Sequence, residues 1–182
     1  MCGTAFLAVG WAGAILVAAA FWTVSDRRLH WLLAAGLSLM GAHLASLGAW
    51  TAAVSALCGA ARCLATLRWP GSAAVTVAPS AAAALLALPT WTGAASMLAV
   101  AASIGSNLVM ATQSGRRMRL LMLPVNAIWI THHLMVGSVP ATASELACAA
   151  GNCWRAARAE KWRRAHAASQ DFFLLPNAAA RI

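Results

Sequence analysis

The sequence predicts an all-α membrane protein with seven transmembrane helices. Of its 182 residues, 62% are hydrophobic and only 9% are charged, whereas a soluble domain has roughly a quarter of its residues charged. The mean hydropathy is +0.73, and the apolar stretches are close to the length of about 20 residues that crosses a bilayer as a helix. This composition excludes a single water-soluble globule, and it excludes a disordered chain, which needs low hydrophobicity.

The first three predicted helices cover residues 5–24, 29–47 and 50–67. Each is apolar and falls within the range of roughly 17 to 25 residues that spans a membrane. The first ends at a polar run that contains two arginines, the second at a glycine turn, and the third before a Pro-Gly pair. Proline and glycine commonly end helices in this way.

The next two predicted helices cover residues 73–88 and 93–112. The earlier one is short, carries Pro79 and ends at Pro89, so we expect residues 73–89 to form a linker helix. The later one ends at a basic run that contains Arg116.

The last two predicted helices cover residues 120–136 and 141–157. A Gly-Ser-Val-Pro turn separates them. The final helix continues into a strongly basic segment, which we take as the end of a transmembrane domain at residues 1–164. Residues 165–182 are then a cytoplasmic tail.

The arginines test the number of spans independently. Lys and Arg collect in cytoplasmic loops, and seven spans place every arginine-bearing loop on one side. Six spans would place Arg116, Arg117 and Arg119 opposite Arg27 and Arg28. We therefore expect seven spans, with the N-terminus outside and the C-terminus in the cytoplasm.

The two halves of the chain resemble each other. Arg28 precedes His43 by the same interval as Arg117 precedes His132, and the glycines that follow the histidines keep the same offset. This predicts two three-helix repeats, residues 5–68 and 93–158, joined by the linker helix. One linker crossing makes the repeats parallel. The alternative is chance similarity between alanine-rich helices.

Polar residues recur at helical spacing inside the predicted spans, where ionisable groups are costly. Glu145 is the only acid in any span, and Asn152 follows on the same helical stripe. Helix six carries Asn126, Trp129 and His133 at spacings of three and four. The following residues are our candidates for a substrate or proton pathway: His43, Asn126, Trp129, His132, His133, Glu145 and Asn152.

Glu and His can exchange a proton near neutral pH when they are buried together. A proton-linked site with Glu145 near His43 or His132 is one interpretation. The alternative is that these groups only hydrogen-bond neighbouring helices. Arg62 lies about 9 Å along its helix from Arg68, so we expect it to snorkel toward the cytoplasm.

The sequence offers no signature of an enzyme, a metal site or a nucleic-acid-binding face. Zinc-protease, serine-hydrolase and phosphate-loop motifs are missing. Each of two cysteine pairs is five residues apart, which turns the side chains by about 140° on a helix and prevents chelation or a disulfide. Lys and Arg account for thirteen residues, but they flank apolar runs and form no basic face. A haem held by two histidines stays an alternative.

Residues that share order and spacing with a known family occur in both halves of the chain: Arg27, Arg28, His43, Gly48, Arg62, Leu67, Arg68, His132, Gly137, Thr142, Glu145, Asn152 and Arg158. Over residues 20–164 the chain thereby resembles the YgjV-like bacterial inner-membrane proteins. The order of three helices, a linker helix and three further helices is similar to that of the SWEET and PQ-loop superfamily, which includes sugar carriers and PnuC-type vitamin-precursor transporters. No Pro-Gln pair occurs here, and helix six alone among the repeat helices has an internal proline.

The resemblance implies a bacterial inner-membrane transporter that moves a small polar metabolite by facilitated or proton-linked alternating access. Its expected partners are the lipid bilayer and that unknown ligand, with no nucleic acid and no cofactor or metal. A second copy of the chain is a further candidate partner. The alternative is a membrane scaffold or regulatory protein that does not transport.

Overall fold

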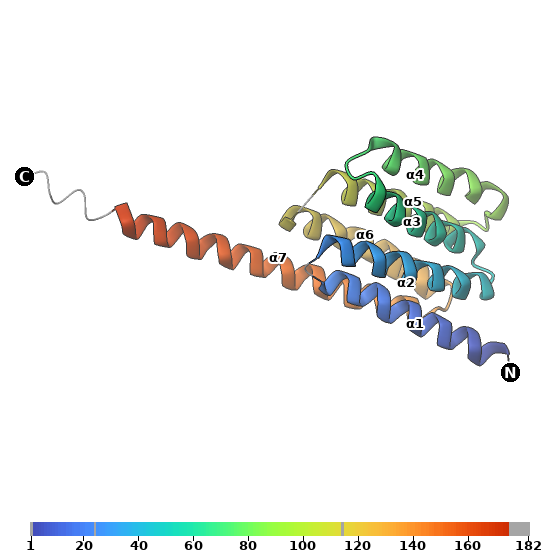
Figure 1. Cartoon of the computed structure of the whole chain (residues 1–182). Helices are drawn as coiled ribbons and strands as arrows, with labels where there is room; N and C mark the ends of the chain where they lie inside the picture. The colour runs from blue at the N-terminus through green and yellow to red at the C-terminus, as the bar shows by residue number, and fades with distance from the viewer. Residues whose placement is uncertain (1, 24, 114, 175–182) are drawn as a thin grey trace, which may run out of the picture.

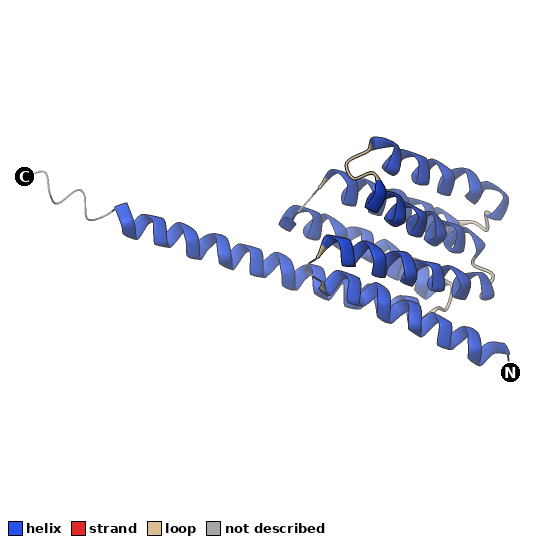
Figure 2. Ribbon diagram, in the orientation of Figure 1, coloured by secondary structure: helices blue, strands red, loops and turns tan. Residues whose placement is uncertain are grey.

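A computed structural model describes residues 2–23, 25–113 and 115–174, which form helices joined by short turns (Figure 1). The helices are α1 (Cys2–Trp22), α2 (Asp26–Ser46), α3 (Trp50–Arg68), α4 (Ala73–Ala87), α5 (Ala94–Thr112), α6 (Gly115–Met135) and α7 (Val139–Leu174), with a short 3-10 turn at Leu88–Thr90. No strand occurs in these ranges (Figure 2). The predicted all-helical fold is confirmed.

Six helices form a closed ring. Around the ring, α1 packs on α2, α2 on α3, α3 on α5, α5 on α6, α6 on α7, and α7 returns to α1. The helix α4 lies outside, against α3 and α5 (Figure 1). The ring order places α3 and α7 on opposite walls.

Five of the helices, α1 to α5, are long and apolar enough to cross a membrane. The other two, α6 and α7, have 21 and 36 residues. Both are long enough to span, but they are less apolar, because α6 begins with Arg116, Arg117 and Arg119 and α7 contains a basic run from Arg155 to Arg164.

The helix α1 packs very closely on α2 because two glycines meet there. A Cβ atom on Gly13 would lie 3.0 Å from the carbonyl oxygen of Gly36, and one on Gly36 would lie 2.9 Å from the backbone nitrogen of Val17. Glycine therefore allows backbone-to-backbone contact, as is common between membrane helices.

Two short turns also require glycine. Gly48, between α2 and α3, and Gly137, between α6 and α7, have φ angles of 75° and 71°. This left-handed conformation is unfavourable for other residues. It places each following helix antiparallel to the one before.

The structure extends two predicted helices. Helix α6 begins at Gly115, whereas it was predicted to begin at residue 120. Helix α7 continues to Leu174, whereas it was predicted to end at residue 157. The added residues are rich in Arg and Ala, which favour helix, and the arginines lower the hydropathy by which the ends were predicted.

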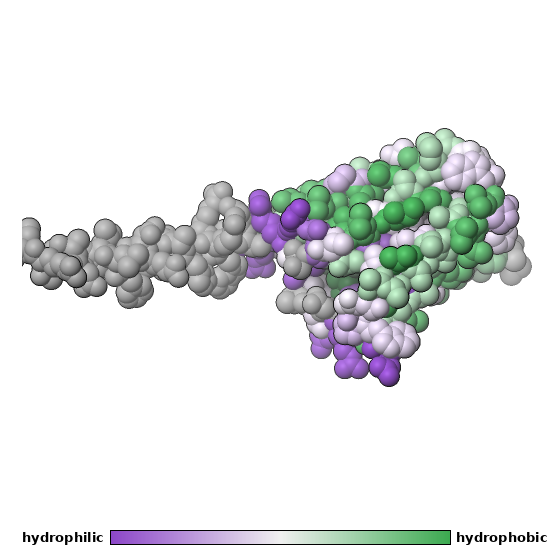
Figure 3. Space-filling view, turned by 90° about the horizontal axis from the view of Figure 1, so that it is seen from above, coloured by the Kyte–Doolittle hydropathy of each residue, from purple (hydrophilic) through white to green (hydrophobic). Residues whose placement is uncertain are grey.

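The start of α2, the end of α3 and the start of α6, which carry Arg27, Arg68 and Arg116, lie at the end of the ring from which α7 projects (Figure 1). The face shown in Figure 3 is largely apolar, and its most hydrophilic residues gather at this end. The opposite end contains the two glycine turns. The arginines are thus segregated as their order in the sequence predicted.

Candidate functional site

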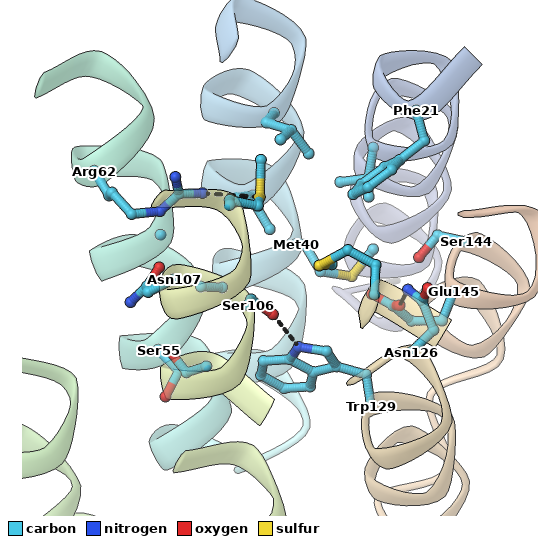
Figure 4. A pocket seen from close by; sticks show the side chains of 18 of the residues that line it. Phe21, Met40, Ser55, Arg62, Ser106, Asn107, Asn126, Trp129, Ser144 and Glu145 are labelled. Atoms are coloured by element: carbon cyan, nitrogen blue, oxygen red, sulfur yellow. Dashed lines mark hydrogen bonds between the residues drawn. The ribbon is translucent and has the colours of Figure 1, made fainter. Parts of the chain in front are cut away.

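The ring encloses a cavity of about 80 Å³ in its centre (Figure 4). All six ring helices contribute to its wall. The polar and aromatic lining residues are Ser55, Arg62, Ser103, Ser106, Asn107, Asn126, Trp129, His133, Ser144 and Glu145. A buried water needs on the order of 10–15 Å³ of such space, so the cavity has room for a few waters or a small ligand.

Helix α6 presents three of the predicted site residues to the cavity. Asn126, Trp129 and His133 all line it, which confirms that they share one helix face. The Trp129 Nε1 donates to Ser106 Oγ of α5 at 3.4 Å, and the His133 ring stacks on Trp129 at 5.3 Å. The Nδ1 atom of His133 has no hydrogen-bond partner among the described residues, so this imidazole is available to a ligand or a water.

Glu145 is held by a chain of side-chain amides. Asn126 Nδ2 donates to Glu145 Oε2 at 2.6 Å, Asn152 Nδ2 donates to Asn126 Oδ1 at 3.0 Å, and Arg119 Nη1 donates to Asn152 Oδ1 at 3.3 Å. We call these four residues the amide chain. Asn152 is fully buried and lies behind the cavity wall. The structure therefore joins three predicted site residues and adds Arg119.

His43 and His132 lie outside the cavity wall and make equivalent bonds. The Nδ1 atom of each ring lies near a backbone carbonyl oxygen 37 residues earlier in the chain, Phe6 O at 3.0 Å and Ala95 O at 2.9 Å. Their second nitrogens differ. His43 Nε2 lies 3.0 Å from Ser138 Oγ, whereas His132 Nε2 has no partner in the described part of the chain. The hydrogen bond of Glu145 is to Asn126, not to His43 or His132.

Arg62 does not snorkel. Its side chain is only 5% exposed and lines the cavity, so the expectation from its distance to the helix end is wrong. Arg62 lies two turns after Ser55 and therefore on the same face of α3. Because that face points into the ring, the guanidinium group meets α5 instead of the cytoplasmic surface.

Sequence reasoning did not identify Arg119 or Asn107 as site residues. The Arg119 guanidinium is buried and lies over the ring of Phe21 at 5.8 Å. Asn107 lines the cavity, and its Nδ2 donates to Ser80 Oγ of α4 at 3.0 Å. Asn107 could have been identified as a single amide side chain in an otherwise apolar helix. Nothing in the sequence distinguishes the buried Arg119 from the exposed arginines just before it.

A second hollow of about 1030 Å³ lies at the arginine-bearing end of the ring. We call it the vestibule; its cationic lining residues are Arg27, Arg68, Arg116, Arg119 and Arg155. No Asp or Glu is among the described residues that line it. Met110 lines both the vestibule and the central cavity, so this side chain lies between the two.

The described residues include no group of three or more His, Cys, Asp or Glu side chains that could hold a metal ion. Cys58, Cys63, Cys148 and Cys153 are free thiols. For a haem held by His43 and His132, both Nε2 atoms would have to be available, and Ser138 lies within hydrogen-bond distance of that atom in His43.

Comparison with known proteins identifies the family. A family model described as Imp-YgjV, bacterial inner membrane protein, matches residues 5–163. Neither the curated proteins nor the solved structures contain a significant match. The matched range covers all seven helices of the described chain apart from the two ends, and it includes both the cavity and the amide chain. The chain belongs to the Imp-YgjV family of bacterial inner membrane proteins.

Proposed function

We propose that this protein is a carrier that moves a small polar metabolite across the bacterial inner membrane by alternating access. The observation that carries the proposal is the central cavity, which a closed ring of six helices surrounds and whose wall contains Arg62, Asn126, His133 and Glu145. Polar and ionisable groups inside a membrane bundle are costly, and they usually mark a substrate or ion pathway.

The proposed topology has seven spans, with the N-terminus outside and the C-terminus in the cytoplasm. Five apolar helices and the segregation of arginines at one end support it. Helices α6 and α7 then cross the bilayer within the ring, where their polar faces are shielded from lipid by the other four helices.

We further propose that α1–α3 and α5–α7 are parallel repeats joined by α4. Two sets of contacts support this arrangement. His43 and His132 bond to carbonyl oxygens at the same interval of 37 residues, and Gly48 and Gly137 have nearly equal positive φ angles. The position of α4 outside the ring fits a linker. Repeats of this kind allow one half to move against the other around a central site.

In this mechanism Glu145 is the group that carries a proton. Its carboxyl group lies at the cavity wall and accepts a hydrogen bond from Asn126. His133 faces the same cavity with an unpartnered Nδ1. A proton on Glu145 would move with the site as it opens to each side in turn, which links metabolite flux to the proton gradient.

The test is flux into proteoliposomes that contain the purified full-length protein. Labelled sugars, nucleosides, vitamins and amino acids are supplied at two pH values, with Glu145→Gln beside the wild type. We expect one class to enter faster than into protein-free liposomes, with a pH dependence that Glu145→Gln removes. Thr131→Val is the matched control, because Thr131 is exposed and its hydroxyl donates only to Ala127 O.

A flat result for every metabolite class, obtained with correctly folded protein, would contradict the carrier proposal. The second candidate is a scaffold or regulatory protein. It is favoured by α7, whose backbone continues as a helix to Leu174, well beyond the ring (Figure 1). An absence of flux with folded protein would favour this second candidate, with the projecting part of α7 as its binding surface.

A further inference from the structure

The central cavity contains a guanidinium group that has no oxygen partner among the described residues. The Nη2 atom of Arg62 contacts two sulfur atoms, Met110 Sδ at 3.4 Å and Cys63 Sγ at 3.6 Å, and its Nε atom has no hydrogen-bond partner. A guanidinium carries five N–H donors, and burying a charged group is unfavourable unless an opposite charge or hydrogen bonds compensate. An oxyanion in the cavity would supply that compensation.

A carboxyl group occupies the opposite wall. Arg62 comes from α3 and Glu145 from α7, which are opposite each other in the ring, and Figure 4 shows them on opposite sides of the pocket. Glu145 accepts a hydrogen bond from Asn126 of the neighbouring helix α6. The cavity therefore presents a positive group at one side and a hydrogen-bond acceptor at the other.

The approach to the cavity favours anions. The vestibule is lined by five arginines, and Met110, which contacts Arg62, lies between the vestibule and the cavity. A cleft lined by one sign of charge raises the local concentration of oppositely charged ligands. An anion that passes from the vestibule into the cavity beside Met110 meets the Arg62 guanidinium there.

We infer that the central cavity binds a small carboxylate that carries a hydrogen-bond donor at its other end, that is, a small amino or hydroxy acid. This inference rests on the proposed function and names its substrate class. The carboxylate pairs with the Arg62 fork, a geometry in which two parallel N–H···O bonds form, and the amino or hydroxyl group donates toward Glu145, directly or through a water in the cavity. A phosphate fits less well. Among the described residues that line the cavity, Arg62 is the single Lys or Arg, and the carboxyl group of Glu145 would repel a second negative charge.

The experiment measures binding to the full-length protein in nanodiscs by ligand-induced thermal stabilisation. The probes are glycine, alanine and lactate, compared with glucose, ethanolamine and inorganic phosphate. We expect stabilisation by the first three alone, and at least about tenfold weaker binding in Arg62→Met, because hydrogen bonds to a charged group are lost. Arg158→Gln is the matched control, since Arg158 is exposed and stacks on Trp154 outside the cavity.

The stability of the ligand-free variant separates a binding role from a structural one. Methionine replaces an incompletely bonded cation beside two sulfur-containing side chains, so Arg62→Met should unfold at a temperature no lower than the wild type. A structural arginine would give a clear loss. Arg62→Lys is the second variant; it keeps the charge but loses the planar fork, and we expect intermediate affinity.

Two results would overturn the inference. One is stabilisation by glucose, ethanolamine or phosphate without the carboxylates, and the other is unchanged carboxylate binding in both Arg62 variants. Flux of a neutral sugar that Arg62→Lys leaves unaltered would reject the substrate class while upholding the carrier. The absence of flux for every class would reject the carrier itself.

Discussion

Asn126 of α6 forms side-chain hydrogen bonds with two polar residues of α7. Its Nδ2 donates to Glu145 and its Oδ1 accepts from Asn152. Since a guanidinium only donates and an ionised carboxylate only accepts, the amide chain has a single direction, from Arg119 at the vestibule to Glu145 at the cavity. This direction fixes the orientation of both amide groups.

Asn126→Leu should destabilise the protein by about 1–3 kcal/mol, because it leaves buried polar atoms of Asn152 and Glu145 without partners. The measurement is thermal unfolding in detergent. Thr131→Val, five residues later on the exposed side of α6, should leave the midpoint nearly unchanged. Equal midpoints for the two variants would show that the amide chain does not contribute to stability.

At the scale of the elements, the ring depends on how closely its helices approach one another. Helices α1 and α2 meet through Gly13 and Gly36, where backbone atoms leave no room for a side chain. Helices α5 and α6 also approach closely at Gly105, where a Cβ atom would lie 3.3 Å from the Cγ2 atom of Val125. Small residues at these contacts therefore let neighbouring helices of the ring pack closely.

Gly13→Val should separate α1 from α2 and destabilise the protein by about 1–3 kcal/mol, which is the usual cost of overpacking. The same unfolding assay measures this loss. The neighbouring Ala12 is exposed, so Ala12→Val adds similar bulk on the lipid-facing side and serves as the control. If Gly13→Val unfolded at the wild-type temperature, the close contact of α1 and α2 would be dispensable.

At the scale of the whole molecule, two asymmetries coincide. The arginines at the helix ends gather at one end of the ring, and the vestibule opens at that end. The other end has the two glycine turns, with His43 in the last turn of α2 and His132 and His133 in the last turn of α6. In the proposed topology the arginine-bearing end faces the cytoplasm, because basic loops stay on the cytoplasmic side.

Reporter fusions at the two termini test this orientation. A C-terminal fluorescent protein that folds only in the cytoplasm should be bright, and an alkaline phosphatase that is active only outside should be active at the N-terminus. Replacing Arg27 and Arg28 by Gln should weaken the preference without changing the count of spans. Reporters on the same side would contradict an odd number of spans.

The order and type of the helices were available from the sequence, because hydropathy and turn residues are local properties. The helices predicted at residues 50–67 and 93–112 each differ from the observed α3 and α5 by one residue at one end. Helix periodicity also identified the α6 face with Asn126, Trp129 and His133, since side chains three and four residues apart lie together on any helix.

The tertiary structure alone determined which faces meet. Periodicity gives a helix a polar face but does not specify the helix opposite it, so the closure of the ring through α3–α5 and α1–α7 could not be predicted. The same limit explains Arg62, whose distance from the helix end suggested the cytoplasm, although its helix face directs it into the cavity. It also explains Glu145, whose partner is Asn126 rather than a histidine, because the neighbouring wall decides which donor reaches the carboxyl group.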